Sequence, residues 1–352
     1  MKILVLTHSV APTSGWGRCA SDLIIGLREA GYEVVVVKEK DDGGEGGVVL
    51  RRGLGLFLSA FRIRKFLRRA DVVHVLDGYP NAIIASLANL GIGKKIIVTA
   101  IGTYSIEPLY RWKTAWLLAW SYRRAAWVTC ISRFTRDQLL ARIRLSRISV
   151  VNLSIDTKEF SKPHTTQREL LMLSVGALKY RKGYHIAIPA FARAKQQIPN
   201  LRYVIVGSQE DSGYTKELRL LAQRCGVEND VEFVPHISSG RLIECYRRAS
   251  LFILTSVNQG HHVEGFGLVF LEAAAAGLPV IGTRGNGIED AVSDGYNGLL
   301  VAQGDIEASA DAMTKILSDR HLWSSMSENS VLWAHAHDLG SMIREYEKLY
   351  TT

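Results

Sequence analysis

The chain has 352 residues, which is more than one ordinary hydrophobic core supports and suits two domains. Apolar residues make up 47% and charged residues 22%, a composition that excludes a largely disordered chain. Residues 1–165 carry 25 Lys and Arg against 13 Asp and Glu, so the formal charge of +9 is concentrated in this half and would attract anions of any class.

The cysteines and the N-terminal residues bear on the cellular compartment. Cys19, Cys130, Cys225 and Cys245 are widely spaced, which is typical of buried thiols in a reducing cytosol rather than of a zinc site or a redox pair. The apolar run 3–6 is too short for a signal peptide, and no stretch reaches the ~20 apolar residues that cross a bilayer. We therefore expect a cytoplasmic protein that contacts a membrane, if at all, peripherally on the inner face.

Short runs rich in Val and Ile alternate with helical patterns along the whole chain, which predicts parallel sheets covered on both faces. In the first half the predicted strands are residues 2–7, 33–37, 71–76, 95–99, 126–130 and 148–152. Residues 41–47, rich in Gly and Asp, are predicted to form a mobile loop. The expected fold class is α/β, with two doubly wound Rossmann-like domains that face a cleft.

Residues 56–70 predict a helix with two unlike faces. Leu56, Ala60, Ile63 and Leu67 form an apolar stripe that should pack on a sheet. The other face mixes apolar and basic side chains, namely Phe57, Leu58, Phe61, Arg62, Arg64, Lys65, Arg68 and Arg69. Two interpretations stay open: a surface that docks on an anionic membrane or an acceptor, or a solvated basic helix with its phenylalanines beneath a loop. The tryptophan-rich segment 112–127 is a candidate second patch, half of which must be core.

Nucleic acid is the other partner that such a basic surface could attract. Basic residues by themselves supply only nonspecific, salt-dependent binding, and the sequence contains no recognition motif. We therefore expect no nucleic-acid partner.

Residues 157–167 are polar, contain Pro163 and lack periodicity, so they are predicted to link the two domains, with the boundary near residue 165. The alternation then restarts, with predicted strands at 170–175, 201–206, 231–234, 250–255, 279–282 and 299–301. The predicted domains are 1–165 and 166–338, followed by a last helix at about 339–350.

The strongest functional signal lies at residues 250–279. An apolar strand is followed by a polar loop, and Gly267 opens a short helix that closes at Gly277. In an open parallel sheet such a loop faces the ligand-binding edge. The main-chain amides of Gly267, Leu268 and Val269 can cradle a diphosphate, and Gly265 and Gly267 allow a close approach of the backbone.

Two carboxylates flank this turn. Glu264 suits sugar hydroxyls and Glu272 suits a ribose, because a carboxylate near phosphates is tolerable only where it accepts hydrogen bonds. If each residue is considered alone, Glu264 could equally be a solvent-exposed charge in a loop. Glu272 could equally be a helix residue whose hydrogen bonds are made within the protein. His261 and His262 lie in a glycine-containing loop without the spacing of helical metal ligands, so no metal site is expected. The Gly15-Trp16-Gly17 turn lacks the third glycine of a dinucleotide fingerprint.

The segment EGFGLVFLE, at residues 264–272, resembles the signature of glycosyltransferase family 4, whose members are retaining enzymes of the GT-B fold. The resemblance continues in the family's order through residues 174–194, 203–222, 231–238 and 279–301, and more weakly through 1–18, 123–139 and 150–160. It therefore covers nearly the whole chain. It implies a soluble, metal-independent enzyme that takes a hexose from a UDP-, GDP- or ADP-sugar, without any cofactor, for a glycan, polysaccharide or lipid-linked acceptor of the cell envelope.

The resemblance also implies roles for individual residues. Glu264 would bind hydroxyls of the transferred sugar, Glu272 the ribose and Lys182 the phosphates. Phe233 would border the base, and Gly15 and Gly17 would form a loop that closes over the donor from the N-terminal, acceptor-binding domain. The donor set also includes Gly265, Phe266, Gly267, Leu268 and Val269. The last helix would pack back on the N-terminal domain.

Two positions depart from the family pattern. Ala177 stands where the family usually has an arginine beside its phosphate glycine, so Lys179 or Arg181 are candidate substitutes. Ile101 stands in the turn 99–102 where many members have a histidine that faces the sugar. These departures motivate one alternative, a non-catalytic glycan-binding scaffold. The other alternative is a nucleotide-sugar epimerase of the same fold.

Overall fold

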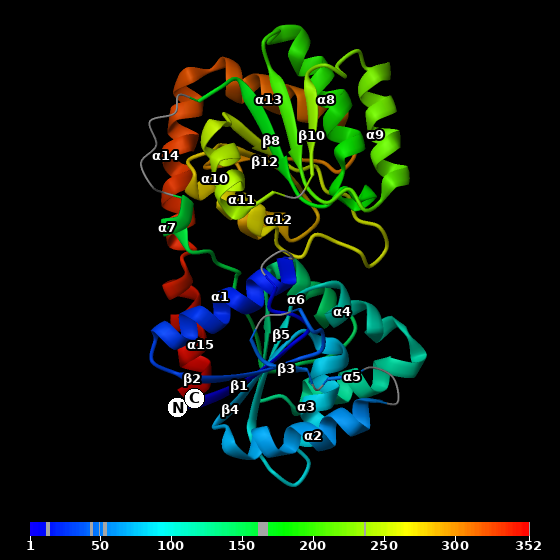
Figure 1. Ribbon diagram of the computed structural model, residues 1–352, viewed down its shortest axis with the longest axis vertical. Helices are drawn as coiled ribbons and strands as arrows, with labels where there is room; N and C mark the ends of the chain where they lie inside the picture. Colours follow the sequence, from blue (N-terminus) through cyan, green and yellow to red (C-terminus); the bar gives the residue numbers. More distant parts are fainter. Residues whose placement is uncertain are drawn as a thin grey trace. The chain divides into compact units, whose positions relative to one another are not determined.

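The computed structural model describes residues 1–11, 15–42, 45–48, 50–51, 55–160, 168–235 and 237–351 (Figure 1). The chain divides into two compact units, one formed by Met1–Ser154 with Leu339–Thr352 and the other by Ile155–Asp338. The sequence-based boundary near residue 165 lies inside the second unit. Among the described residues, no helix has the length and apolar character needed to span a bilayer.

The first unit contains a parallel sheet with the strand order β3-β2-β1-β4-β5-β6-β7. The strands are β1 (Lys2–Thr7), β2 (Glu33–Lys38), β3 (Gly47–Val48), β4 (Val72–Leu76), β5 (Lys95–Ala100), β6 (Trp127–Cys130) and β7 (Ile148–Val150). Ile3 in the central strand β1 is in register with Val34 of β2 and Val72 of β4. The predicted strands are confirmed; the apolar runs of the central strands β1, β4 and β5 are buried, whereas β7 at the edge is only partly buried.

The predicted mobile loop 41–47 is in part wrong. The side chain of Asp42 is only 4% exposed, and its Oδ2 accepts hydrogen bonds from the main-chain nitrogens of Val10 and Ala11 at 2.8 and 3.1 Å. Gly47 belongs to β3, which pairs with the end of β2. The Gly and Asp content suggested a mobile loop, whereas the contacts of the Asp42 carboxylate fix the start of this segment. Residues 43–44 lie outside the described residues.

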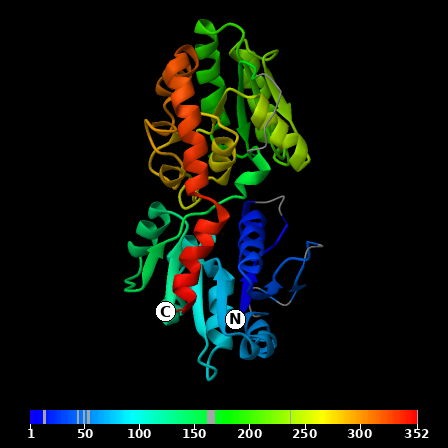
Figure 2. The ribbon, with the colours of Figure 1, turned by 90° about the vertical axis from the view of Figure 1, so that its left-hand side faces the viewer.

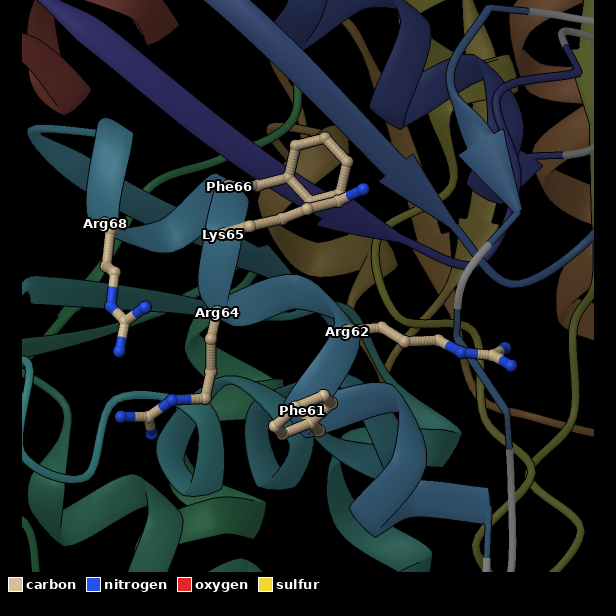
Figure 3. A pocket seen from close by; sticks show the side chains of 6 residues that line it. All are labelled: Phe61, Arg62, Arg64, Lys65, Phe66 and Arg68. Atoms are coloured by element: carbon tan, nitrogen blue, oxygen red, sulfur yellow. The ribbon is translucent and has the colours of Figure 1, made fainter.

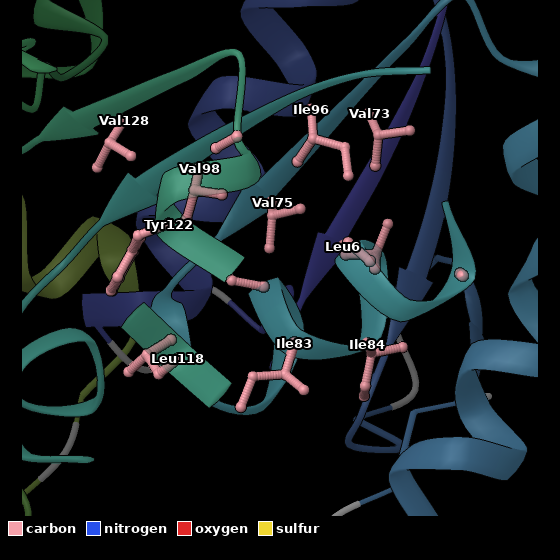
Figure 4. Close-up of a cluster of buried hydrophobic side chains, with 14 of the residues drawn as sticks. Leu6, Val73, Val75, Ile83, Ile84, Ile96, Val98, Leu118, Tyr122 and Val128 are labelled. Carbon is pink, nitrogen blue, oxygen red and sulfur yellow. The ribbon is translucent and has the colours of Figure 1, made fainter. Parts of the chain in front are cut away.

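One face of the first sheet is covered by α2 (Gly55–Arg69), α3 (Ile83–Ala88) and α5 (Trp112–Arg124). Figure 4 shows side chains of Leu6, Val73, Val75, Ile96, Val98 and Val128 from the strands packed around Ile83, Ile84, Leu118 and Tyr122 from the helices. The predicted stripe of α2 is confirmed, since Leu56, Ala60, Ile63 and Leu67 are all buried in this cluster. These four residues recur at helical spacing and therefore share one face.

The C-terminal helix α15 (Leu339–Thr351) packs within the first unit, beside α1 (Gly15–Glu29) (Figure 2). Gly26 permits the close approach, because a Cβ atom there would lie 2.7 Å from Ile343 of α15. A buried polar network adds a second attachment: His74 Nδ1 lies 2.6 Å from the Tyr350 hydroxyl, and His74 Nε2 lies 2.8 Å from Thr99 Oγ1. The Tyr346 hydroxyl also contacts Thr99, at 3.0 Å.

The remaining segments of the first unit connect the strand ends. They are the short helical segments η1 (Gly78–Ala82) after β4, α4 (Thr103–Ile106) with η2 (Glu107–Tyr110) after β5, and α6 (Arg133–Leu140) after β6. Because every strand pair of this sheet is parallel, the carboxyl ends of the strands and the starts of these segments lie at one edge.

The second unit contains a parallel sheet with the strand order β10-β9-β8-β11-β12-β13. Its strands are β8 (Leu171–Val175), β9 (Arg202–Val206), β10 (Val231–Val234), β11 (Leu251–Ile253), β12 (Val280–Thr283) and β13 (Gly298–Val301). Its helices are α7 (Thr157–Phe160), η3 (Tyr180–Lys182), α8 (Tyr184–Gln197), α9 (Ser212–Arg224), α10 (Ser239–Arg248), α11 (Leu268–Ala275), α12 (Ile288–Ala291), α13 (Ile306–Ser318) and α14 (Arg320–Ala336). The order reverses between β8 and β11, which is where open α/β sheets bind ligands.

The predicted linker 157–167 is wrong over its first residues. Residues 157–160 form the short helix α7, with Thr157 and Phe160 buried. The Phe160 ring lies 5.9 Å from the ring of Tyr246, so one aromatic side chain attaches this polar stretch to the second unit. Pro163 and its neighbours lie outside the described residues.

Candidate active site

The candidate site is built on the two strands that flank the reversal of the second sheet. The segment after β8 contains η3 and then Gly183, and the segment after β11 contains residues 254–267. Two hydrogen bonds join these segments: Thr255 Oγ1 donates to the Gly183 carbonyl at 2.7 Å, and the Val257 nitrogen donates to the Arg181 carbonyl at 2.8 Å. Residues that are more than 70 positions apart in sequence are thereby fixed next to each other.

Gly183 makes this junction possible. Its φ is +74°, in the left-handed region, and a Cβ atom at this position would lie 1.7 Å from the Thr255 carbonyl oxygen. Only glycine fits such a position. The close contact holds Lys182, the last residue of η3, near the segment that follows β11.

Lys182, Arg181 and Glu264 form an ion cluster at this junction. Lys182 Nζ lies 2.6 Å and Arg181 Nη1 lies 3.1 Å from Glu264 Oε2. The side chains of Lys182 and Glu264 are only 11% and 12% exposed, whereas that of Arg181 is 31% exposed. Ser256 Oγ lies 3.4 Å from the same carboxylate oxygen. A bound anion can replace Glu264 as the partner of the two cations. Hydroxyl groups of the same ligand can then replace the cations as partners of Glu264.

The surroundings shift the pKa values of this cluster. Burial alone raises the pKa of the Glu264 carboxyl, but Lys182 and Arg181 outweigh it and the net pKa lies below its ordinary value. Burial lowers the pKa of the Lys182 ammonium, and the attraction of Glu264 partly offsets that effect. Glu264 is consequently an acceptor-only carboxylate at neutral pH, as a contact to sugar hydroxyls requires.

The helix α11 begins where the sequence predicts it. Gly267 is the residue before Leu268, with φ +90°, and a Cβ atom on it would lie 2.8 Å from the Phe270 ring. The amides of the first turn, including those of Leu268 and Val269, have no partner in their own helix, and the positive end of the helix dipole adds to their attraction for anions. Phe266 is 1% exposed, so its side chain belongs to the core and only its main chain can face a ligand. The predicted end is also confirmed, with Gly277 at φ +73°.

Glu272 lies on α11 and is 9% exposed. Its Oε2 accepts a hydrogen bond of 2.8 Å from the hydroxyl of Tyr246, a buried residue of α10. The sequence analysis missed this contact of Tyr246 with the candidate site, because no local pattern connects residues from two helices. The contact fixes the orientation of the carboxylate that is expected to bind the ribose.

The expected base-bordering and phosphate positions lie at the ends of β8 and β10. Phe233 of β10 has the Arg219 guanidinium 4.9 Å from its ring centroid, so one face of the ring carries a cation. Ala177 follows Gly176, and its side chain is short and has no charge with which to contact a phosphate. The Lys182 side chain lies close to the same turn, because its Cε would be 3.4 Å from a Cβ atom placed on Gly176. Of the two candidate substitutes, Arg181 joins the ion cluster, whereas Lys179 is exposed.

Gly15 and Gly17, which were expected in a loop, lie in the first turn of α1. A Cβ atom on Gly17 would lie 1.8 Å from the Ala11 carbonyl oxygen, whereas one on Gly15 would meet nothing within 4 Å. A glycine is therefore required at position 17 by the close packing against Ala11, independently of any contact with a donor. Residues 12–14, before this turn, lie outside the described residues.

Within the described residues, no three or more His, Cys, Asp or Glu side chains come together in an arrangement that could hold a metal ion. His262 pairs with Gln259 through the main chain, and its side chain is exposed. Ile101, at the position where a histidine was considered, is buried.

Known proteins share both the sequence pattern and the fold. The family model described as "Glycosyl transferases group 1" matches residues 156–333, and the model described as "Glycosyltransferase Family 4" matches residues 13–159. Two Rossmann-like units of this kind define the GT-B class of glycosyltransferases. The chain belongs to glycosyltransferase family 4 and is therefore a glycosyltransferase of the EC 2.4 class.

Several relatives align over most of their length. The chain is 27% identical over 368 residues to a glycogen synthase of Mycobacterium tuberculosis, covering 91% of the chain and 86% of the relative. It is 25% identical over 363 residues to the GDP-mannose-dependent alpha-(1-6)-phosphatidylinositol monomannoside mannosyltransferase of Mycolicibacterium smegmatis, covering 94% and 93%. Among solved structures, Anabaena HepE in complex with UDP-glucose superimposes with a TM-score of 0.83 at 19% identity, covering 100% of both chains.

Proposed function

We propose that the chain transfers a hexose from a nucleotide diphosphate sugar to a glycan, polysaccharide or lipid-linked acceptor, with retention of configuration and without a metal ion. The second unit binds the donor and the first unit binds the acceptor. The ion cluster of Lys182, Arg181 and Glu264 next to the start of α11 is the observation that carries the proposal.

The chemistry follows from these charges. When the glycosidic bond to the donor breaks, the leaving nucleotide diphosphate gains negative charge. The amides of Leu268 and Val269 and the ammonium of Lys182 stabilise that charge, and they do so most in the transition state because the charge is largest there. In this proposal, these positively polarised groups together do what a metal ion does in other transferases.

Donor binding would rearrange the ion cluster. In the structure Lys182 and Arg181 both contact Glu264. A diphosphate attracts the same two cations, and once they turn to it, Glu264 is released to accept hydrogen bonds from hydroxyls of the sugar. The relatives differ in the nucleobase of their donor, since HepE was solved in complex with UDP-glucose and the mannosyltransferase is named for GDP-mannose. The proposal therefore does not specify the nucleobase.

A Glu264→Gln substitution tests the assignment. Transfer should fall about 10²-fold or more, the size typical of losing one transition-state contact. Nucleotide affinity should be kept or improved, because the two cations lose the carboxylate that competes with the phosphates. Glu228→Gln, an exposed glutamate of the same unit, is the control. Unchanged turnover in Glu264→Gln would refute the role of this carboxylate.

A nuclear magnetic resonance assay of the donor distinguishes the alternatives. Isomerisation of the donor sugar without acceptor would establish an epimerase, whereas slow hydrolysis with release of the nucleotide diphosphate supports transfer. No turnover of any sugar nucleotide, with or without acceptor, would favour a scaffold that only binds glycans.

The first unit also supports a finer proposal, peripheral docking on an anionic membrane. Phe57 and Phe61 of α2 are 62% and 77% exposed, and Trp112 and Trp116 of α5 are 81% and 67% exposed. The phenylalanines of α2 therefore do not lie beneath a loop. The sequences of α2 and α5 contain several Lys and Arg and no Asp or Glu, and α3 packs between the two helices.

A hollow of about 510 Å³ lies on α2, lined by Phe61, Arg62, Arg64, Lys65, Phe66 and Arg68 (Figure 3). Figure 3 shows Arg62 extending away from Arg64 and Arg68, with the Lys65 ammonium beside the Phe66 ring, 4.9 Å from its centroid. Aromatic groups can enter the lipid headgroup region while the cations attract the phosphates, each contributing about 1 kcal/mol. The proposed location is therefore the cytoplasmic face of the cell membrane, where the four free thiols would stay reduced.

A further inference from the structure

Three aromatic rings gather at the carboxyl edge of the first sheet. His8 follows β1, Trp16 lies in the first turn of α1, and Tyr104 lies in α4 after β5. The ring centroids of His8 and Trp16 are 5.5 Å apart, and those of Trp16 and Tyr104 are 4.8 Å apart. We call these three residues the aromatic platform. His8 is partly exposed, Trp16 is half-buried, and Tyr104 is 37% exposed, so each of the three residues reaches the surface of the first unit.

One side of the platform is held by the segment after β1. His8 Nδ1 lies 2.8 Å from Glu39 Oε2, and Glu39 is 13% exposed. The next residues are fixed by Asp42, which accepts hydrogen bonds from Ser9 Oγ at 2.6 Å and from the Val10 nitrogen at 2.8 Å. Asp42 is itself buried in an ion pair with Lys38. The Asp42 carboxylate thus fixes the backbone that directly follows His8.

The other side is held by the segment after β4. Asp77 has φ +77°, the one positive value outside glycine among the described residues, and its Oδ1 accepts hydrogen bonds from the Gly78 nitrogen at 2.8 Å and from Ser105 Oγ. Ser105 follows Tyr104 directly, and its carbonyl accepts a hydrogen bond of 2.9 Å from the Tyr122 hydroxyl. A backbone of this strained kind is found where the surrounding structure sets a functional geometry. The position of Tyr104 is therefore determined by buried hydrogen bonds to α5 and to the end of β4.

We propose that the aromatic platform binds a pyranose ring of the acceptor. A pyranose has a face of C–H groups that packs on aromatic rings and a rim of hydroxyls that needs polar partners. The rings of Trp16 and Tyr104 supply the apolar surface, while the His8 imidazole and the Glu39 carboxylate supply acceptors or donors at its edge. This inference rests on the proposed function, because only a transferase needs an acceptor sugar here.

The charge at the platform selects a neutral ligand. Glu39 lies beside His8 and would repel a phosphate group, whereas it would accept hydrogen bonds from hydroxyls. The platform also lies on the first unit and shares no residue with the donor cluster around Lys182. A neutral sugar unit of a glycan or glycolipid acceptor fits this environment better than a nucleotide.

Saturation-transfer nuclear magnetic resonance with methyl α-D-glucopyranoside and methyl α-D-mannopyranoside tests the platform without knowledge of the full acceptor. With the unmodified protein, at least one pyranoside should receive saturation on its ring C–H protons. Trp16→Ala and Tyr104→Ala should each weaken that binding about tenfold, and Trp16→Phe should retain most of it. Tyr110→Ala is the matched control, because Tyr110 is an aromatic residue of the same unit with 40% exposure.

A nucleotide titration of the same samples separates this inference from the proposed function. UDP and GDP are added and the thermal shift is recorded; Tyr104→Ala should keep the nucleotide affinity of the unmodified protein. If nucleotide binds and the pyranoside signal is missing, or is as strong in Trp16→Ala and Tyr104→Ala as in the unmodified protein, the platform is wrong while glycosyl transfer stands. If the pyranoside signal follows the variants as expected and no nucleotide binds, the platform stands and the proposed donor site is wrong.

Discussion

Gly183 shows at the level of one residue how the donor site depends on the backbone. Its left-handed conformation and its contact with the Thr255 carbonyl bring Lys182 to Glu264, and neither the conformation nor the space accepts a side chain. The sequence KGY at 182–184 gives no sign of this contact, since Thr255 is far away in the chain.

Gly183→Ala should therefore destabilise the second unit by several kcal/mol and abolish transfer, because the added methyl group overlaps a carbonyl oxygen that cannot move without breaking the junction. Urea unfolding and a transfer assay measure the two effects. Gly240→Ala is the control: Gly240 lies in α10 with open space around it, and alanine there should be neutral or stabilise by up to about 1 kcal/mol. Equal stability of the two variants would contradict this account of Gly183.

The charges around Glu264 give a prediction for pH. Its pKa is lowered in the folded protein, so its contribution to stability is present above the unfolded pKa and is lost as pH falls through the folded one. Arg181→Gln removes one of the two cations that lower this pKa, and the acid limb of the transfer rate should move to higher pH. Lys179→Gln, which removes an exposed cation that does not contact Glu264, should leave the acid limb in place.

At the level of elements, the two faces of helix α2 have different roles. The buried stripe attaches it to the sheet, and its aromatic and basic face is exposed. Arg64 differs from its neighbours, because its Nη1 donates to the carbonyls of Ala88 and Leu90 at 2.8 and 2.9 Å and so ties α2 to the end of α3. A test of membrane docking should spare this residue.

Replacing Arg62, Lys65, Arg68 and Arg69 by Gln should reduce flotation with vesicles of phosphatidylglycerol and phosphatidylcholine by at least tenfold, because each lost cation removes about 1 kcal/mol. Vesicles of phosphatidylcholine alone should bind neither protein. The control replaces the exposed Arg193, Arg202, Arg224 and Arg241 of the second unit, which changes the net charge equally. Equal losses in both variants would show a general charge effect and remove the case for a docking surface.

The apolar part of the same surface has its own test. Phe57→Ser with Phe61→Ser should weaken vesicle binding even at high salt, where the attraction of the charges is screened. Since both rings are exposed, the free energy of unfolding should change little, and circular dichroism during heating measures that.

At the level of the whole molecule, the C-terminal helix α15 completes the first unit through the buried network of His74, Thr99, Tyr346 and Tyr350. Burial lowers the pKa of His74 to about 3. Between this value and the ordinary pKa near 6.5, the unfolded chain binds a proton at this residue and the folded protein does not. The contribution of His74 to stability therefore falls as pH falls through this window.

His74→Gln should flatten the dependence of the free energy of unfolding on pH between 4 and 6, relative to the unmodified protein, by up to about 1.4 kcal/mol per pH unit. Tyr350→Phe should lower stability by about 1–3 kcal/mol while leaving that pH dependence, because it removes only the partner of His74 Nδ1. Urea unfolding at several pH values measures both variants. His321→Gln, at an exposed position, is the control, and a similar flattening there would contradict the role of His74.

Local sequence patterns account for the secondary-structure elements and for the motif at residues 264–272. Strands, the stripe of α2 and the turn from Glu264 to Leu268 are encoded by residues that are neighbours in the chain, because helix and strand periods and glycine conformations are local properties. The same holds for the basic charge of the first half.

Which of these residues meet depends on long-range contacts within each unit. The pairing of Lys182 and Arg181 with Glu264, the bond from Tyr246 to Glu272, the burial of Asp42 and the gathering of His8, Trp16 and Tyr104 all join segments from different strand ends. Neighbouring elements likewise leave Phe57 and Phe61 exposed. The contact of Phe160 with Tyr246 attaches α7 to the second unit. The physical reason is that such contacts depend on the order of strands in the sheet, which places distant loops at one edge and which no local pattern encodes.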